Sequence, residues 1–252
     1  PRRPPIADLQ AELAANADAE KRAWWERYLK GEAAFRGIPT PVIRSSASAW
    51  WDRHDAESLD PDRQLELCLE LLRCPMTEDK LAGMLILGER LIPAGRVDWI
   101  AGTTSFATLF AERHLADWNA VDWFCVRVLG PLIEHSGETC ARAVAAWVSA
   151  DTLWQRRAAL VGFVNLAPSG SYAELIVETA DRLVVDRERF AQTGVAWVIR
   201  ELGRSRPDLS EDFLRRHRDD MSPEARKQAR GKRKPQTIRS GRTSSSNSAS
   251  VT

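Results

Sequence analysis

The sequence predicts an all-α protein in which helical hairpins stack into a solenoid. Apolar residues recur at helical spacing along most of the chain, in segments of about 12–18 residues with short breaks between them. No pair of strands joined by a hairpin turn such as Asn-Gly can be found. The breaks carry residues that end helices, namely Gly95, Ser136-Gly137, Pro168-Ser169-Gly170, Pro207 and Ser222-Pro223. Many helices joined by short turns are typical of stacked helical repeats.

The expected helices follow one another from residue 60. Asp60 is a candidate N-cap with Pro61 at the first helical position. The next helix begins near Thr77 and runs to about Leu91, before Pro93. Further helices are expected at residues 106–116, 118–134, 138–149, 152–166, 171–184, 187–204 and 208–218. Pro131 lies inside the segment 118–134 and can end that helix early.

Composition fits one soluble globular body. A chain of 252 residues with 44% hydrophobic and 28% charged side chains can bury a sizeable core as one large domain or a run of repeats. It contains no run of eighteen apolar residues, so no membrane span is expected. Four scattered cysteines without metal-ligand spacing favour a reduced, cytoplasmic setting, which would be nucleoid-associated in a bacterium.

The charge is unevenly distributed. From Arg215 to Thr252 there are eleven Lys or Arg and three acids, a balance of +8, so the other residues carry −7 of the net +1. We expect a folded domain over residues 1–228 and a basic, Ser-rich, disordered tail over 229–252, because the tail has too few apolar residues to bury. The tail either adds nonspecific affinity for DNA phosphates or is solvated without a role.

Common catalytic signatures are absent from the sequence. There is no Gly-x-Gly-x-x-Gly or Walker loop, no His-Glu-x-x-His zinc motif and no Gly-x-Ser-x-Gly elbow. The four histidines are isolated from one another and from the cysteines, so neither a metal nor a cofactor is expected. An active site must therefore be assembled across several helices.

Tryptophan is unusually frequent, with ten in the chain. A single Trp is more often a core residue than a ligand-binding one, and the exceptions should have charged neighbours on the same helix face. Trp118 and Asp122 are four residues apart, Trp197 and Arg200 are three apart, and the basic pair Arg156-Arg157 lies on a helix between them. Successive helices of a solenoid can bring these groups to one concave surface.

Several segments in the same order resemble AlkD-type DNA alkylation repair glycosylases. They are Arg27-Tyr28-Leu29-Lys30 with Phe35-Arg36-Gly37-Ile38-Pro39-Thr40-Pro41, then residues 117–122, 149–159 and 194–201, and finally Met221-Ser222-Pro223-Glu224-Ala225-Arg226. Each segment alone is weakly specific, but together they cover roughly residues 20–228 in register. The resemblance implies a curved α-superhelix of HEAT-like repeats whose concave face holds duplex DNA.

The resemblance also assigns roles to individual residues. It implies a catalytic Asp122 flanked by Trp118 and Trp197, DNA-backbone contacts from Arg157 and Arg200, and a cleft-lining Tyr28. Because Arg156 and Arg157 are adjacent, the phosphate contact can belong to either. Trp123 departs from the small polar residue expected after the carboxylate, and a ring there either packs between helices or narrows the cleft.

The function implied is a monomeric DNA glycosylase that releases cationic N3- or N7-alkylated purines from duplex DNA. Such a base leaves as a neutral molecule, so one carboxylate can stabilise the oxocarbenium-like sugar and position water. The resemblance further implies excision without base flipping and tolerance of bulky adducts. A noncatalytic HEAT-like DNA-binding or scaffold protein is the alternative, and a protein-binding helical repeat is a third interpretation, which would explain the acidic body.

Overall fold

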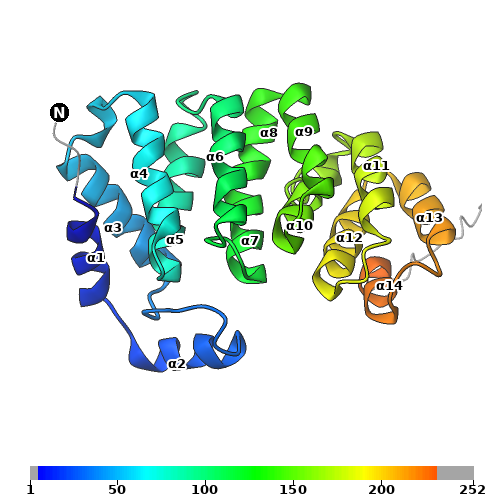
Figure 1. Ribbon diagram of the computed structural model, residues 1–252, viewed down its shortest axis with the longest axis horizontal. Helices are drawn as coiled ribbons and strands as arrows, with labels where there is room; N and C mark the ends of the chain where they lie inside the picture. Colours follow the sequence, from blue (N-terminus) through cyan, green and yellow to red (C-terminus); the bar gives the residue numbers. More distant parts are fainter. Residues whose placement is uncertain (1–4, 232–252) are drawn as a thin grey trace, which may run out of the picture.

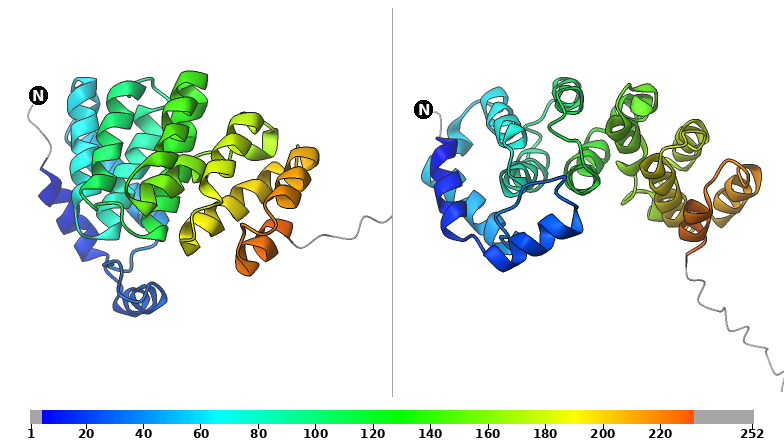
Figure 2. Two further views of the ribbon diagram at one scale, coloured as in Figure 1. Left: turned by 45° about the vertical axis from the view of Figure 1, so that its right-hand side comes forward. Right: turned by 60° about the horizontal axis from the view of Figure 1, so that its bottom comes forward.

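The computed structural model describes residues 5–231, and within this range the chain is helical, with one isolated β-bridge between Ala34 and Met76. The helices form two rows along a curved arc, which is seen best from below (Figure 1, Figure 2). Neighbouring helices contact each other along an inner row of α3, α5, α7, α10, α12 and α14 and an outer row of α4, α6, α9, α11 and α13. The expected all-α class and stacked helical hairpins are confirmed.

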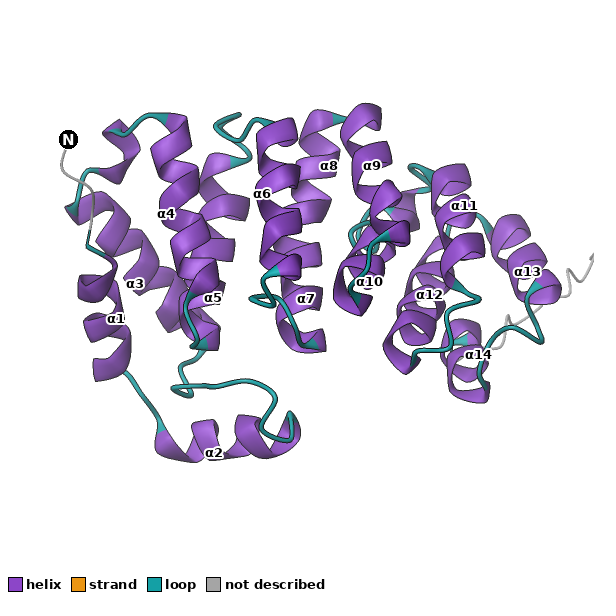
Figure 3. Cartoon of the chain, in the orientation of Figure 1, coloured by secondary structure: helices purple, strands orange, loops and turns teal. Residues whose placement is uncertain are grey.

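The helices have the following bounds. The first half holds α1 (Ile6–Ala15), α2 (Ala19–Tyr28), α3 (Thr40–Arg53), α4 (Pro61–Arg73), α5 (Thr77–Ile86), α6 (Trp99–Ala111) and α7 (Trp118–Phe124). The second half holds α8 (Gly130–Ser136), α9 (Glu138–Ala145), α10 (Leu153–Val161), α11 (Ala173–Leu183), α12 (Arg189–Leu202), α13 (Pro207–Arg216) and α14 (Pro223–Arg230). Short 3₁₀ turns and loops join them (Figure 3).

Side-chain caps set the start of several helices. The carboxylate of Asp60 accepts the N–H of Arg63, with Pro61 at the first helical position as the sequence predicts. Equivalent caps begin α6, α7, α10 and α14 at Asp98, Asp117, Thr152 and Ser222. The missed cap at Asp98 explains one error: α6 begins at Trp99, seven residues before the expected 106–116 segment, and ends at Ala111.

Two π-helical turns extend α5 and α7. They span Leu87–Leu91 and Cys125–Leu129, and they touch where Gly88 lies against Arg127. A Cβ atom on Gly88 would be 2.0 Å from the carbonyl oxygen of Arg127, so only glycine permits this approach. The second π turn runs directly into α8, so the helix continues past Pro131 and does not end early there. The wider turn relieves the clash between the proline ring and the carbonyl four residues earlier.

One hydrophobic core runs between the two rows. Phe106, Phe110 and Phe124 pack edge-to-face at its centre, with centroids 5.1 and 6.1 Å apart. All four cysteines are free, and burial raises the pKa of Cys140 to about 11. The core reaches Ala229, which is buried in α14, the last helix of the described residues. Of the disordered tail expected over residues 229–252, residues 232–252 lie outside the described residues.

α2 stands apart from both rows. It runs across the lower ends of the inner helices in Figure 1, and none of its residues is buried. The loop after it is held by Glu78, whose carboxylate accepts the backbone N–H groups of Arg36, Gly37 and Ile38. Arg36 forms a two-point ion pair with the buried Asp79, at 2.8 and 3.1 Å. These contacts fix α2 over the concave side. No helix within residues 5–231 is long and apolar enough to cross a membrane.

Candidate active site

A cleft of about 490 Å³ opens where α2, α7, α10, α12 and α14 meet. Its lining consists of Tyr28, Leu29, Lys30, Glu32, Trp118, Asp122, Arg157, Arg189, Phe190, Thr193, Trp197, Glu224 and Gln228. Five of the residues singled out in the sequence therefore line one cleft, although they come from four helices. The two others, Arg156 and Arg200, do not line it.

Asp122 and Arg157 form the central contact of the cleft. The Nε and Nη2 atoms of Arg157 donate to the two oxygens of Asp122 at 2.8 and 2.9 Å. Both side chains are well shielded, with 5% of Arg157 and 14% of Asp122 exposed. A planar guanidinium that meets a carboxylate at two points fixes its orientation. Arg157 thus gives Asp122 a fixed direction and a counter-charge.

The far side of Arg157 is bonded to α12. Its Nη1 atom donates to the carbonyl of Phe190 at 2.5 Å and to the hydroxyl of Thr193 at 3.3 Å. Gly194 leaves the space for this arrangement, because a Cβ there would lie 3.1 Å from Nη1 and 3.3 Å from a methyl of Val161. Nearly all donors of the guanidinium are therefore used inside the protein.

Aromatic rings form one wall of the cleft. Tyr28 meets Trp118 edge-to-face, with centroids 5.8 Å apart and an angle of 74°. Trp24 stacks on the other face of Tyr28 at 5.2 Å and 9°. Trp24 and Tyr28 remain 51% and 55% exposed, which is unusual for large rings in contact. Trp118 lies one turn before Asp122 on α7, so a bound group that touches the carboxylate can also touch these rings.

α12 and α14 supply the opposite wall. Phe190, Thr193 and Trp197 lie at helical spacing on one face of α12. Arg189 pairs with Glu224 of α14 at 2.7 and 2.8 Å, and the hydrogen bond from this arginine lowers the pKa of the Glu224 carboxyl. Sequence reasoning missed Arg189, Phe190 and Thr193. Phe190 and Thr193 lie seven and four residues before Trp197, and this helical spacing is the signal that would have found them.

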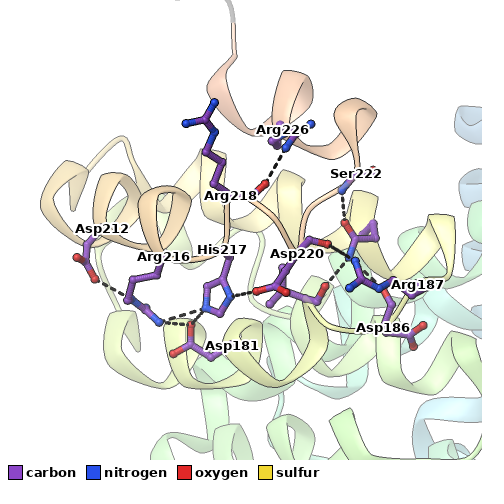
Figure 4. A network of polar contacts seen from close by, with 12 residues as sticks. Asp181, Asp186, Arg187, Asp212, Arg216, His217, Arg218, Asp220, Ser222 and Arg226 are labelled. Atoms are coloured by element: carbon purple, nitrogen blue, oxygen red, sulfur yellow. Dashed lines mark hydrogen bonds and ion pairs between the residues drawn. The ribbon is translucent and has the colours of Figure 1, made fainter.

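A polar network holds α14 against α12 (Figure 4). His217 contacts Asp181 and Asp220 through its two ring nitrogens, at 2.8 and 2.9 Å. Gln192 donates to the carbonyls of Asp186 and Asp220 and accepts the N–H of Ser222, the cap of α14. The position of the α14 side chains in the cleft thus depends on contacts far from it.

The remaining predicted residues have other surroundings. Arg156 pairs with Asp186 at 2.9 Å and donates to the carbonyls of Ala150 and Asp151, which ties down the turn before α10. Arg200 pairs with Glu201 at 2.9 Å beside a neighbouring hollow.

Trp123 packs outside the cleft, with the Arg127 guanidinium 4.7 Å from its ring centre. Of the two alternatives for this ring, packing between helices is therefore the one observed. No group of three or more His, Cys, Asp or Glu side chains able to hold a metal ion occurs within residues 5–231.

Comparison with known proteins bears on the fold and on the family to which the sequence is similar. Residues 9–232 match the family model described as DNA alkylation repair enzyme. Among solved structures, the fold matches a predicted DNA alkylation repair enzyme from Enterococcus faecalis with a TM-score of 0.73 and 18% identity. That match covers 86% of this chain and 96% of the other. No curated protein sequence matched the chain.

Proposed function

We propose that this chain, which belongs to the DNA alkylation repair enzyme family, is a DNA glycosylase that hydrolyses the N-glycosidic bond of cationic alkylated purines in duplex DNA. The observation that carries the proposal is one carboxylate, Asp122, held by Arg157 in a cleft walled by Trp118 and Trp197. The cleft offers a fixed negative charge beside aromatic faces.

The reaction needs little more than this arrangement. A purine alkylated at N3 or N7 is already positively charged, so it leaves as a neutral base without a general acid. As the bond breaks, positive charge develops on the sugar, and a fixed carboxylate stabilises it. The same carboxylate can accept a hydrogen bond from the attacking water. Asp122 is 14% exposed, so it is shielded from bulk water and still reachable.

The indole rings bind the charged substrate. Trp118 and Trp197 line the same cleft as Asp122, and a cation over the face of such a ring gains about 0.5–2 kcal/mol. This attraction falls once the base has become neutral, which favours release. Tyr28 supports Trp118 from α2 through the edge-to-face contact.

The surroundings of Arg157 favour another role than the phosphate contact that the resemblance implies. Its guanidinium is buried and bonded to Asp122, Phe190 and Thr193, which leaves little capacity for a phosphate. We therefore infer that Arg157 positions the carboxylate. Lys30 and Arg189, both exposed on the cleft lining, are better placed to meet the DNA backbone.

The resemblance extends the proposal to excision without base flipping and to adducts larger than methyl. The exposed ring of Tyr28, which lines the cleft, and that of Trp24, which stacks on Tyr28, support the second point, because they present apolar surface next to the site. A duplex carrying a bulky N3-adenine adduct tests it: release of that base is expected, and processing of a methylated duplex only would contradict it.

A noncatalytic DNA-binding protein is the second candidate, and the two-point ion pair favours it. The contact between Asp122 and Arg157 also joins α7 to α10, a purely structural role that needs no chemistry. Release of N7-methylguanine from duplex DNA by the purified protein decides between the two functions. Detectable binding with no release from any alkylated purine would leave the noncatalytic function.

A further inference from the structure

A second hollow, of about 920 Å³, lies beyond the cleft, between α12, α13 and α14. Its lining consists of Arg200, Glu201, Gly203, Arg204, Pro207, Ser210, Glu211, Leu214, Ala229, Arg230 and Gly231. Three of these residues are arginines: Arg200 lies on α12, Arg204 in the turn after it, and Arg230 at the end of α14. It shares no lining residue with the cleft that contains Asp122.

The hollow and the cleft belong to one continuous stripe along α12. Thr193, Trp197 and Arg200 are spaced by four and three residues, which keeps them on one face of α12, and Arg204 follows in the turn just after the helix. The first two line the cleft and the last two line the hollow. α14 continues in the same way, since Glu224 and Gln228 line the cleft and its end lines the hollow. A long ligand in the cleft can therefore reach the hollow.

The lining of the hollow holds three arginines against two acids, Glu201 and Glu211, so positive charge exceeds negative charge there. Glu201 accepts from Arg200 at 2.9 Å and from Arg204 at 3.3 Å, so one carboxylate holds two guanidinium groups side by side. Arg204 is 69% exposed, and Arg230 is exposed and makes no ion pair with any residue that the structure describes. Guanidinium groups in such a cluster bind phosphate well.

We propose that this hollow binds the phosphodiester backbone of DNA on one flank of the lesion. The inference rests on the proposed function, because the cleft must hold the damaged nucleotide. With a helical rise of 1.5 Å per residue, continued from α12 (Arg189–Leu202) into the turn after it, Arg204 lies about 10 Å from Trp197 and about 16 Å from Thr193 along the helix direction. A strand that follows this stripe advances about 3.4 Å per base pair, so the contact falls roughly three to five base pairs from the lesion.

Binding of undamaged duplex DNA at increasing salt tests the hollow without the reaction. The double variant Arg204→Gln/Arg230→Gln is compared with Arg63→Gln/Arg142→Gln. The control arginines lie on α4 and α9 of the outer row and are 62% and 63% exposed, with i,i+3 and i,i+4 partners. Each lost phosphate contact should reduce the slope of log K against log salt by about 0.9. We expect the hollow variant to lose about one to two units of slope and the control to keep the wild-type slope.

The flank is tested with duplexes that carry N7-methylguanine and are shortened from either end. Wild-type affinity should fall when one flank drops below roughly five base pairs and not when the other does. The hollow variant should lose this asymmetry. Equal slopes for both double variants, or an asymmetry that survives in the hollow variant, would overturn the proposal. If the wild-type protein releases no base while the predicted binding differences are observed, only the proposed glycosylase function is contradicted.

Discussion

Asp122 of α7 and Arg157 of α10 form a two-point ion pair in which each carboxylate oxygen accepts one hydrogen bond, at 2.8 and 2.9 Å. The two residues are 35 positions apart in the sequence. The pair joins two inner helices at the cleft, and the same guanidinium continues to α12 through the carbonyl of Phe190. One arginine therefore ties together three elements that line the candidate site.

The first prediction concerns Arg157→Gln. We expect base release at saturating DNA to slow on the order of 10–100-fold, because Asp122 loses its fixed orientation, while duplex affinity changes little. The control is Arg156→Gln, which breaks the neighbouring ion pair with Asp186 and should leave the rate of release unchanged. A large loss of duplex affinity with an unchanged rate at saturation would instead make Arg157 a phosphate contact.

The same variant should also be less stable. Removing one partner of a shielded ion pair leaves the other charge uncompensated and costs about 3–5 kcal/mol in free energy of unfolding. Denaturant unfolding of Arg157→Gln measures this cost. The double variant Arg157→Gln/Asp122→Asn should recover part of the loss, since no unpaired charge remains. If it recovers none, the ion pair is not the source of the destabilisation.

A second prediction concerns Gly194→Val. Its Cβ would lie 3.1 Å from Nη1 of Arg157, and the added methyl groups need further room, so the guanidinium must shift away from Asp122. We expect slower release with duplex affinity retained, as for Arg157→Gln. Gly194→Ala should have a smaller effect, because its single methyl needs only a small displacement. A valine variant with the wild-type rate would show that Arg157 need not occupy this position.

A third prediction separates the ring of Tyr28 from its hydroxyl. Tyr28→Ala removes both the edge contact to Trp118 and the stack with Trp24, so release of N7-methylguanine should fall. An aromatic pair contributes about 0.5–1.5 kcal/mol, which corresponds to roughly a threefold to tenfold loss. Tyr28→Phe keeps both contacts and should stay close to wild type. An equal loss in both variants would assign the role to the hydroxyl group.

A fourth prediction concerns the fold. Gly88→Ala places a Cβ 2.0 Å from the carbonyl oxygen of Arg127, which forces the two π turns apart. We expect a loss of about 1–3 kcal/mol in free energy of unfolding, measured with denaturant. Gly130→Ala is the matched control, because its Cβ would lie 3.3 Å from the nearest atom, the carbonyl oxygen of Gly162. Equal stability of the two variants would contradict the close approach at Gly88.

Much of the fold could be predicted from the sequence, because helix periodicity and caps are local signals. Asp60 with Pro61 marked α4 correctly, whereas the uncharged start of α6 hid the cap at Asp98. The helix over residues 118–134 was expected, but the π turn that lets it continue past Pro131 cannot be recognised from periodicity alone. α2 was not expected as a helix, since it buries no residue and so lacks an apolar stripe.

The candidate site could be predicted only in part. Trp118 and Asp122 share a helix face, so their proximity follows from spacing. The bonding of Arg157 depends on the packing of three helices, and no local pattern distinguishes this buried arginine from Arg156 beside it. The pair Arg189–Glu224 likewise depends on how α12 packs against α14. The pair Arg200–Glu201 depends on the directions that two neighbouring side chains of α12 take. The resemblance named residues, and the geometry distinguishes the surroundings of each.

The most direct test of the account compares base release by wild type and Asp122→Asn on duplex DNA carrying N7-methylguanine. Asparagine keeps the shape of the side chain and removes its charge, so duplex affinity should be retained while the rate at saturation falls on the order of 10²–10³-fold. Release by wild type and its loss in the variant would place the chemistry at Asp122. Equal release by the two proteins would contradict the central claim, because the carboxylate would then play no part in breaking the bond.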